Sequence, residues 1–341
     1  MEEWRTILSK PIKLESIKGI TKEDIKNIKL AAKTYPMYIN SYYFSLIKSK
    51  DDPIYKQCIP NIEELNEDLS EDPLAEETHT PTNGIVHKYP DRALFLISNI
   101  CTMYCRFCTR KRKVGKKENI SNEEIKQGLQ YLKDHEEIRD VILSGGDPLT
   151  HDDNKIEYIL KQLREIKHIE IIRLGTRVPC ALPQRITENL CNILKKYHPI
   201  FINTHFNHPN EITEESSKAC TMLANAGIPL GNQTVLLKGI NDNIDTIKSL
   251  VHKLLKIRVK PYYLYHADKA KGTKHFMTNV KTGMEIIKGL RGWTSGLAVP
   301  QYVIDTEGGK IPILPEYLKE YKDGKIILKN YQDKEFTYID P

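Results

Sequence analysis

The sequence predicts an α/β protein whose main domain is a partial (β/α)6-type barrel with an N-terminal helical extension. Six short apolar runs alternate with amphipathic helical stretches from residue 93 onward, and such alternation implies parallel strands. Polar and glycine-rich segments follow these runs directly, and barrels collect their active sites at the ends of their strands. The length of 341 residues suits one catalytic domain of this kind plus an extension.

The chain divides into three expected segments. Residues 1–84 are expected to form the helical extension and a linker, because Thr21-Lys-Glu-Asp24 resembles a capping box ahead of apolar residues at helical spacing. Within this segment, the stretch 63–82 is acidic and punctuated by prolines, which is typical of a surface connection. Residues 85–315 are expected to form the barrel, and residues 316–341 a short C-terminal tail.

The barrel prediction brings the candidate functional segments to one mouth. The predicted strands are residues 93–99, 140–144, 169–174, 199–204, 231–237 and 260–265. Amphipathic helical stretches lie between them, among them 122–132 and 155–166. The segments after the strands are 144–148, 175–177, 204–208 and 266–268, followed later by Asp305 and 308–310. Because parallel strands end on the same side of a barrel, these segments are expected to converge.

Composition excludes several classes of protein. The chain is 40% hydrophobic and 28% charged, and it has no 18-residue apolar stretch, so we expect no membrane partner. The first five residues are acidic and precede no apolar region, which does not predict a signal peptide. Seven cysteines, three of them clustered, fit a reducing cytoplasm better than a disulfide scaffold. A cytoplasmic enzyme is therefore expected.

The most informative motif is Cys101-Thr-Met-Tyr-Cys105-Arg-Phe-Cys108, directly after the first predicted strand. Three thiolates this close together require a metal or a cluster to neutralise them. Structural zinc usually takes four ligands in two spaced pairs, but the next cysteine is Cys180 and the next histidine is His135. A [4Fe–4S] cluster held by three cysteines leaves one iron free to bind a small molecule. The spacing resembles the signature of radical S-adenosylmethionine (SAM) enzymes, with zinc or a redox-active thiol group as the alternatives.

Two further segments are candidates for binding SAM. Gly145-Gly146-Asp147-Pro148 follows a strand and resembles the segment that hydrogen-bonds the SAM amino group in radical SAM enzymes. The alternative is an ordinary turn with Pro148 near the start of a helix. His205 follows the fourth predicted strand and is expected to lie near the cofactor, whereas His208 precedes Pro209 and could simply close a turn.

Four charged residues are candidates for binding a second cofactor and a substrate. Lys310 follows two glycines and could form a Schiff base with pyridoxal phosphate (PLP), or it could be a surface charge. Asp268 and Asp305 would together favour a cationic group such as an ammonium, or they could cap helices or form salt bridges. Arg110 could bind a carboxylate through two parallel hydrogen bonds, although one member of an Arg/Lys run is more often solvated.

These residues belong to longer segments that resemble the lysine 2,3-aminomutase family of radical SAM enzymes. The resemblance extends from about residue 85 to residue 315, some two thirds of the chain. The matching segments are 87–92 (HKYPDR), 101–110 (CTMYCRFCTR), 204–213 (THFNHPNEIT), 231–239 (GNQTVLLKG), 275–276 (HF), 289–292 (GLRG) and 310–312 (KIP).

The resemblance implies an isomerase that converts L-lysine to L-β-lysine by moving the amino group from C2 to C3. In this family a 5′-deoxyadenosyl radical, made from SAM, takes a hydrogen atom from the β-carbon of PLP-bound lysine. By matched position, Cys101, Cys105 and Cys108 hold the [4Fe–4S] cluster, and His205 lies beside SAM. Lys310 matches the PLP lysine, while Arg92 and Gln233 match residues around the PLP phosphate. Arg110 matches the residue that binds the substrate carboxylate, and Asp268 and Asp305 match the pair that binds the ε-ammonium.

The chain departs from the family pattern in three places. The loop from Asp305 to Lys310 is two residues shorter than usual, which affects the reach of Lys310. Lys88 stands where many members have arginine. The chain also stops about thirty residues after Lys310, without the cysteine-bearing tail that links longer members into a zinc-bound tetramer. We therefore expect no zinc and a smaller assembly, a homodimer.

Two other functions compete with a free-lysine aminomutase. Short relatives supply β-lysine for the modification of elongation factor P, and the length of this chain and its segment 268–272 resemble that subgroup. An iron–sulfur or zinc protein that binds RNA through the basic run 110–113 is the second, but aromatic residues for base stacking are not concentrated there. We expect free lysine as the substrate, a flavodoxin- or ferredoxin-type protein as the electron donor, and no nucleic acid partner.

Overall fold

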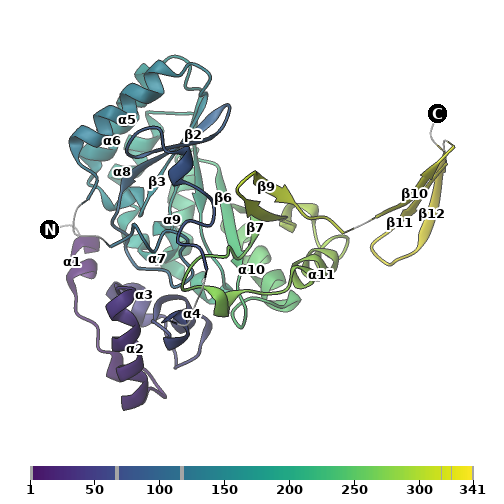
Figure 1. Cartoon of the computed structure of the whole chain (residues 1–341), viewed down its shortest axis with the longest axis horizontal. Coiled ribbons are helices and arrows are strands. Elements are labelled where there is room, and N and C mark those ends of the chain that lie inside the picture. Colours follow the sequence, from purple (N-terminus) through teal and green to yellow (C-terminus); the bar gives the residue numbers. More distant parts are fainter. Residues whose placement is uncertain (1–2, 66–68, 116–118, 316, 324, 340–341) are drawn as a thin grey trace.

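The computed structural model describes residues 3–65, 69–115, 119–315, 317–323 and 325–339. Nine strands of this part of the chain form one sheet in sequence order, and helices pack against it (Figure 1). The strands are β1 (Ile85–Tyr89), β2 (Arg92–Ser98), β3 (Asp140–Gly145), β4 (Ile171–Gly175), β5 (Ile200–Thr204), β6 (Leu230–Leu236), β7 (Val259–His266), β8 (Gln301–Thr306) and β9 (Gly309–Pro312). Strands β2 to β8 pair in parallel, and β1 and β9 pair antiparallel at the two edges.

The predicted α/β fold is confirmed, and all six predicted strands are present within two residues at each end. The helices that follow strands β2 to β7 are α5 (Asn122–Asp134), α6 (Asp153–Glu165), α7 (Val178–Ala181), α8 (Glu188–Lys195), α9 (Glu214–Asn225), α10 (Ile244–Lys256) and α11 (Val280–Leu290). Strands β1, β8 and β9 were not predicted. β9 is four residues long and largely exposed, so its sequence contains no apolar run that would predict a strand.

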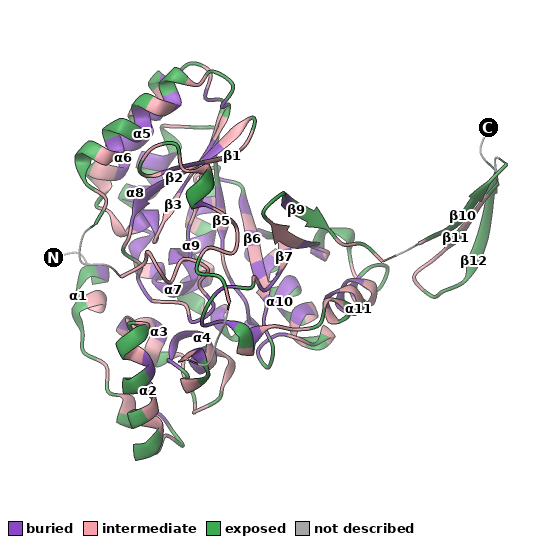
Figure 2. Cartoon of the chain, in the orientation of Figure 1, coloured by how far each residue is buried: buried purple, intermediate pink, exposed green. Residues whose placement is uncertain are grey.

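Burial follows the periodicity that defines each element. Along β6, every second residue from Leu230 to Leu236 is buried, as expected of a strand with one face against a core. Helix α10 buries Ile247, Leu250, Val251 and Leu254, which share one face of a helix. Figure 2 shows the buried residues on the sheet and on the inner sides of the helices, and the exposed residues on their outer sides.

The two edge strands of the sheet approach each other without forming a ladder in the described chain. Side chains join them instead. Lys88 on β1 donates from Nζ to the carbonyl oxygen of Thr306 at 2.5 Å. The hydroxyl oxygen of Tyr89 accepts from the backbone N–H of Lys310 at 3.1 Å. The sheet is therefore a nearly closed barrel with a seam between β1 and β9.

The N-terminal segment is helical, as predicted, with α1 (Glu3–Ser9), α2 (Lys22–Thr34), α3 (Ser41–Ser45) and α4 (Pro53–Cys58). The Thr21–Asp24 capping box is present at the start of α2. The interpretation of 63–82 as a surface connection is wrong in one respect. Two of its carboxylates, Glu64 and Glu76, are buried because each pairs with an arginine of the cysteine loop.

After the barrel, β10 (Leu318–Lys322), β11 (Lys325–Lys329) and β12 (Glu335–Ile339) form a separate antiparallel sheet that projects from the body of the molecule (Figure 1). The expected tail is thus an ordered sheet. The division at residues 84 and 315 stays a prediction. Residues 1, 2, 66–68, 316, 324, 340 and 341 of its outer segments lie outside the described residues. No helix in the described ranges combines the length and the apolar character needed to cross a membrane.

Candidate active site

All of the predicted site residues line one of two adjoining cavities at the mouth of the barrel. The first has a volume of about 330 Å³ and contains the three cysteines, and the second has a volume of about 500 Å³ and contains Lys310. Their common wall includes Arg110, Gln233, Tyr265 and Asp305. A ligand in one cavity therefore lies next to a ligand in the other.

The three cysteines lie on the loop that follows β2, and all three are free thiols in the structure. Burial raises the pKa of the Cys101 and Cys108 thiols, and neighbouring negative charges add to the effect. By themselves, these thiols therefore do not ionise readily. A group that carries positive charge would have to lie between them to hold all three ionised.

A buried ion pair fixes the cysteine loop. Arg106, between Cys105 and Phe107, donates from Nε to Glu64 at 2.9 Å and from Nη2 to the other carboxylate oxygen at 2.5 Å. Arg106 also donates to the backbone carbonyls of Tyr35 and Pro36. The N-terminal segment therefore holds the loop from outside the barrel, and burial with full pairing makes this contact costly to break.

The predicted glycine segment lines the first cavity, but its glycines serve the packing of the protein. A Cβ atom on Gly145 would lie 2.1 Å from the carbonyl oxygen of Ser98, and one on Gly146 would lie 2.3 Å from that of Ile100. Gly145 also has a φ of 132°. Glycine at both positions lets β3 end directly beneath the segment that leads into the cysteines.

The carboxylate of Asp147 is hydrogen-bonded to other groups of the protein. Its carboxylate accepts hydrogen bonds from Thr176 Oγ1 at 2.7 Å, the Arg177 backbone N–H at 2.8 Å and the Leu149 backbone N–H at 3.0 Å. Burial raises the pKa of this carboxyl, although these hydrogen bonds oppose the rise. Asp147 ties the end of β3 to the end of β4 and forms part of the cavity wall.

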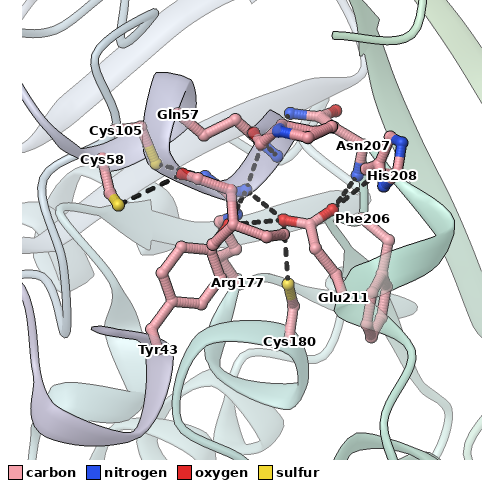
Figure 3. A network of polar contacts seen from close by, with 12 residues as sticks. Tyr43, Gln57, Cys58, Cys105, Arg177, Cys180, Phe206, Asn207, His208 and Glu211 are labelled. Atoms are coloured by element: carbon pink, nitrogen blue, oxygen red, sulfur yellow. Dashed lines mark hydrogen bonds and ion pairs between the residues drawn. The ribbon is translucent and has the colours of Figure 1, made fainter. Parts of the chain in front are cut away.

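Arg177, which the sequence predicted to lie at the mouth without a stated role, reaches the cysteine loop from the end of β4 (Figure 3). Its Nη1 lies 2.7 Å from Sγ of Cys105, and its Nη2 donates to Glu211 at 2.7 Å and to Gln57 at 2.6 Å. Burial opposes ionisation of Glu211, yet Arg177 and the hydrogen bonds to Glu211 hold its pKa below the usual range. The network places a fixed positive charge beside one cysteine.

Two polar atoms in this wall are buried without a hydrogen-bond partner among the described residues, namely Arg177 Nε and His205 Nε2. His205 stacks on Phe107 with ring centroids 5.5 Å apart. Burial, together with the charge of Arg177, lowers the pKa of His205 to about 3, so the imidazole is neutral at physiological pH. Unsatisfied buried polar atoms are rare in proteins, and here they mark a wall that a polar ligand would complete.

The second cavity contains the predicted lysine. Strands β8 and β9 form a hairpin in which Asp305 lies directly opposite Lys310, and Lys310 Nζ donates to Asp305 at 2.6 Å. The hairpin turn consists of Glu307 and Gly308. The shortened loop thus still directs Lys310 into the cavity, where its Nζ lies 5.6 Å from the centre of the Tyr265 ring.

Arg92 and Gln233 lie in this second cavity, as predicted. The Arg92 guanidinium packs 3.9 Å above the ring of Tyr89 and pairs with Asp91 at 2.7 Å. Gln233 donates to the Tyr265 hydroxyl at 3.2 Å. Lys88, where the chain departs from the family pattern, also lines this cavity. Sequence reasoning missed Arg173, Tyr262 and Tyr263, because the apolar residues beside them on β4 and β7 indicated strands but no ligand site.

The two predicted aspartates both line the first cavity, and Asp305 also lines the second. Asp268 follows β7, and burial together with the negative charge of Asp305 raises its pKa to about 7. Lys310 and Lys88 partly oppose that rise. A cation beside Asp268 would favour its ionised form and so oppose this rise in its pKa.

Arg110 is held by a carboxylate that sequence reasoning placed on the surface. Arg110 Nε donates to both carboxylate oxygens of Glu76, at 2.9 and 3.0 Å, and Nη2 donates to one of them at 2.5 Å. The backbone N–H of Arg110 also donates to Cys108 Sγ at 3.4 Å. The arginine therefore lies beside the cysteines and lines both cavities.

Comparison with known proteins matches this arrangement to one family. The model of the radical SAM superfamily matches residues 95–251, and the lysine-2,3-aminomutase model matches residues 287–341. The chain is 50% identical to the L-lysine 2,3-aminomutase of Clostridium subterminale, over 94% of this chain and 79% of that one. The chain belongs to the lysine 2,3-aminomutase family. It is also 50% identical to the L-lysine 2,3-aminomutase of Methanococcus maripaludis, over 99% of this chain and 82% of that one.

A lysine 2,3-aminomutase family member uses a [4Fe–4S] cluster, SAM and PLP, and the two cavities fit these groups. Three adjacent thiols suit a cluster with one open iron. The unpartnered Arg177 Nε and His205 Nε2 suit a polar ligand beside it. The second cavity combines a lysine with further cations and several tyrosines, which suits a phosphorylated aromatic aldehyde.

Family membership does not by itself select the amino acid substrate. The glutamate 2,3-aminomutase of Clostridioides difficile is 47% identical to this chain, over 94% of this chain and 78% of that one. Relatives with similar overall identity therefore carry different substrate names. The choice of amino acid substrate must depend on the side chains that line the cavities.

Proposed function

We propose that this protein is a lysine 2,3-aminomutase that converts free L-lysine to L-β-lysine. The observation that carries the proposal is that Asp268 and Asp305 both line the cavity that contains the cysteines, and Arg110 lines the same cavity. An ammonium group between the two aspartates relieves the repulsion that raises the pKa of Asp268. The side-chain carboxylate of glutamate would add a third negative charge there, so the pair disfavours that substrate.

The site residues divide by cavity. Cys101, Cys105 and Cys108 hold the [4Fe–4S] cluster, and Gly145, Gly146, Asp147 and His205 line the place for SAM. Lys310, Arg92 and Gln233 hold PLP in the second cavity. When bound, the cluster and SAM supply a carbon radical that abstracts hydrogen, and PLP supplies an electron-delocalising carrier for the migrating amino group.

The residues of the chain perform the binding and positioning. Arg110 presents N–H groups to the substrate carboxylate, and Asp268 and Asp305 accept hydrogen bonds from its ε-ammonium. Lys310 would hold PLP, and in the structure its Nζ donates to Asp305 at 2.6 Å. Asp305 thus lies between the proposed cofactor residue and the proposed ammonium site. Burial raises the pKa of Tyr265, which stays a neutral phenol between the cavities.

We also propose a homodimer in the cytoplasm that receives electrons from a flavodoxin- or ferredoxin-type protein. Support for the dimer comes from the β10–β12 sheet, whose side chains Leu318, Tyr321, Phe336, Tyr338 and Ile339 are exposed. A patch of this kind on a projecting sheet suits burial against a second copy. A role in the modification of elongation factor P also uses lysine, and it stays a prediction.

An anaerobic assay tests the function. The reconstituted protein is incubated with SAM, PLP, dithionite and either L-lysine or L-glutamate, and the products are derivatised and identified by mass spectrometry. β-Lysine that depends on every component would support the proposal. Conversion of glutamate instead would reassign the substrate, and intact SAM cleavage without a product from free lysine would reject the free amino acid.

A further inference from the structure

We propose that Glu76 is a positioning residue that orients Arg110 so that one edge of its guanidinium stays available to the substrate carboxylate. This inference rests on the proposed function, because it takes the carboxylate of lysine as the partner of Arg110. Glu76 itself does not contact the reacting atoms. It acts on the substrate only through the arginine.

The contact between the two residues uses one edge of the guanidinium. The donors to Glu76 are Nε, at 2.9 and 3.0 Å, and Nη2, at 2.5 Å. A guanidinium carries five N–H donors in a rigid plane. Glu76 takes the Nε edge, which leaves both N–H groups of Nη1 and the second N–H of Nη2. Within the described chain, the side chain of Arg110 has no other hydrogen bond.

The remaining edge of Arg110 suits a second carboxylate. Two parallel N–H groups on adjacent nitrogens match the two oxygens of a carboxylate. Arg110 lines both cavities, as does Asp305. A substrate that extends from Arg110 toward Asp268 and Asp305 would have its carboxylate held at one end and its ammonium at the other, with its reacting carbons fixed between them.

The segment that carries Glu76 is anchored on several sides. Asp72 pairs with Arg112 at 2.7 Å, and the carbonyl oxygen of Leu74 accepts from Lys88 Nζ at 3.4 Å. Glu76 is itself only 7% exposed and lies 3.6 Å from Nη2 of Arg112. A carboxylate this buried and doubly paired is held in place rather than free to leave. Glu76 therefore holds the guanidinium of Arg110 in a fixed orientation.

The opposite role predicts the opposite result. If Glu76 were a competitor that the substrate carboxylate must displace, its removal would free Arg110 and tighten lysine binding. If Glu76 orients Arg110, its removal lets the guanidinium rotate and weakens lysine binding. The sign of the change in affinity therefore separates the two roles.

The experiment compares two ligands on one protein. The cluster- and PLP-loaded enzyme is titrated anaerobically without SAM, and binding is read from the change in PLP absorbance. The ligands are L-lysine and 1,5-diaminopentane, which is lysine with hydrogen in place of the carboxylate. For Glu76→Gln we expect the Kd of lysine to rise about tenfold to a hundredfold. We expect the Kd of the diamine to stay within about twofold of the wild-type value, because it has no carboxylate for Arg110.

Two further variants complete the test. Glu77→Gln removes the same charge from the neighbouring residue, whose side chain is exposed and pairs with Arg112, and both Kd values should stay unchanged. Glu76→Asp keeps the charge on a shorter side chain and should restore part of the lysine affinity, and it replaces the glutamine variant if that variant does not load its cofactors.

Different results would contradict the role of Glu76, the role of Arg110 and the proposed function. An unchanged ratio of the two Kd values in the Glu76 variants, or tighter lysine binding, would overturn the role of Glu76. A wild-type enzyme that binds lysine no better than the diamine would remove Arg110 as the carboxylate partner. A wild-type enzyme that binds neither ligand would contradict the proposed function itself.

Discussion

Lys310 and Asp305 face each other across the β8–β9 hairpin, with Nζ 2.6 Å from a carboxylate oxygen. The pair joins a residue proposed to hold the cofactor to a residue proposed to hold the substrate. Lys310 lines the cavity even though its loop is two residues shorter than the family pattern. The tight turn at Glu307 and Gly308 places both side chains on the same side of the hairpin, toward the cavities.

Replacement of Lys310 by alanine should abolish the PLP adduct that borohydride reduction traps, because the nitrogen that forms the bond is gone. The adduct is measured by mass spectrometry of the reduced, digested protein. Lys88→Met is the matched control, because Lys88 lines the same cavity but is not expected to form the adduct. The Lys88→Met variant should therefore keep the adduct. An adduct that persists in Lys310→Ala and maps to another lysine would contradict the assignment.

Replacement of Asp305 by asparagine should raise the KM of lysine about tenfold or more, because one counter-charge to the ε-ammonium is lost. The iron content and the cluster spectrum should stay unchanged, since Asp305 is not one of the proposed cluster ligands. Glu307→Gln, in the exposed turn of the same hairpin, is the control and should leave KM unaltered. An unaltered KM in Asp305→Asn would mean that Asp305 serves only the hairpin.

Lysine binding should strengthen as the pH rises through about 7. Burial and Asp305 raise the pKa of Asp268 to about 7, so the carboxyl is mostly neutral at pH 6 and mostly ionised at pH 8. Only the ionised form attracts an ammonium, so the Kd should fall about five- to tenfold between these pH values. Titration of the PLP-loaded enzyme at several pH values measures it. Asp268→Asn should remove most of this dependence, and a wild-type Kd that is flat over the range would refute the assignment.

Replacement of Cys105 by alanine should abolish SAM cleavage, because two cysteines do not retain the cluster. Release of 5′-deoxyadenosine with dithionite, read by chromatography, measures the loss, and iron analysis follows the cluster. Cys191→Ala removes a thiol of helix α8 outside both cavities and should cleave SAM as the wild type does. A Cys105 variant that still releases 5′-deoxyadenosine would overturn the cluster ligation.

Replacement of Glu64 by glutamine should lower the free energy of unfolding by about 3–5 kcal/mol, because it leaves the buried Arg106 without its counter-charge. Urea unfolding followed by circular dichroism measures the change. The neighbouring Glu63 is exposed, and Glu63→Gln should change stability by less than about 0.5 kcal/mol. Equal stabilities of the two variants would show that the pair does not support the cysteine loop.

The parts of the site that sequence patterns could predict are those that local spacing determines. Cys101, Cys105 and Cys108 lie within eight residues, and the strands show as apolar runs. The roles of Glu76 and Arg177 could not be predicted this way, because their partners lie 34 and 72 residues away in the chain. A buried ion pair leaves no periodic signal, and an acidic segment with prolines looks like a solvated linker. The family resemblance located Lys310, but only the register of β8 and β9 shows which residue it faces.

The seam between β1 and β9 has a consequence for the order of folding. Lys88 and Thr306 are separated by 218 residues, and Tyr89 and Lys310 by 221. Contacts between such distant points close a very long loop, and their entropic cost is met only when the intervening strands are already assembled. Lys310 therefore reaches its final position among the last steps of chain assembly. The proposed attachment of PLP to Lys310 would consequently report that the whole barrel, from its first strand to its last, has folded.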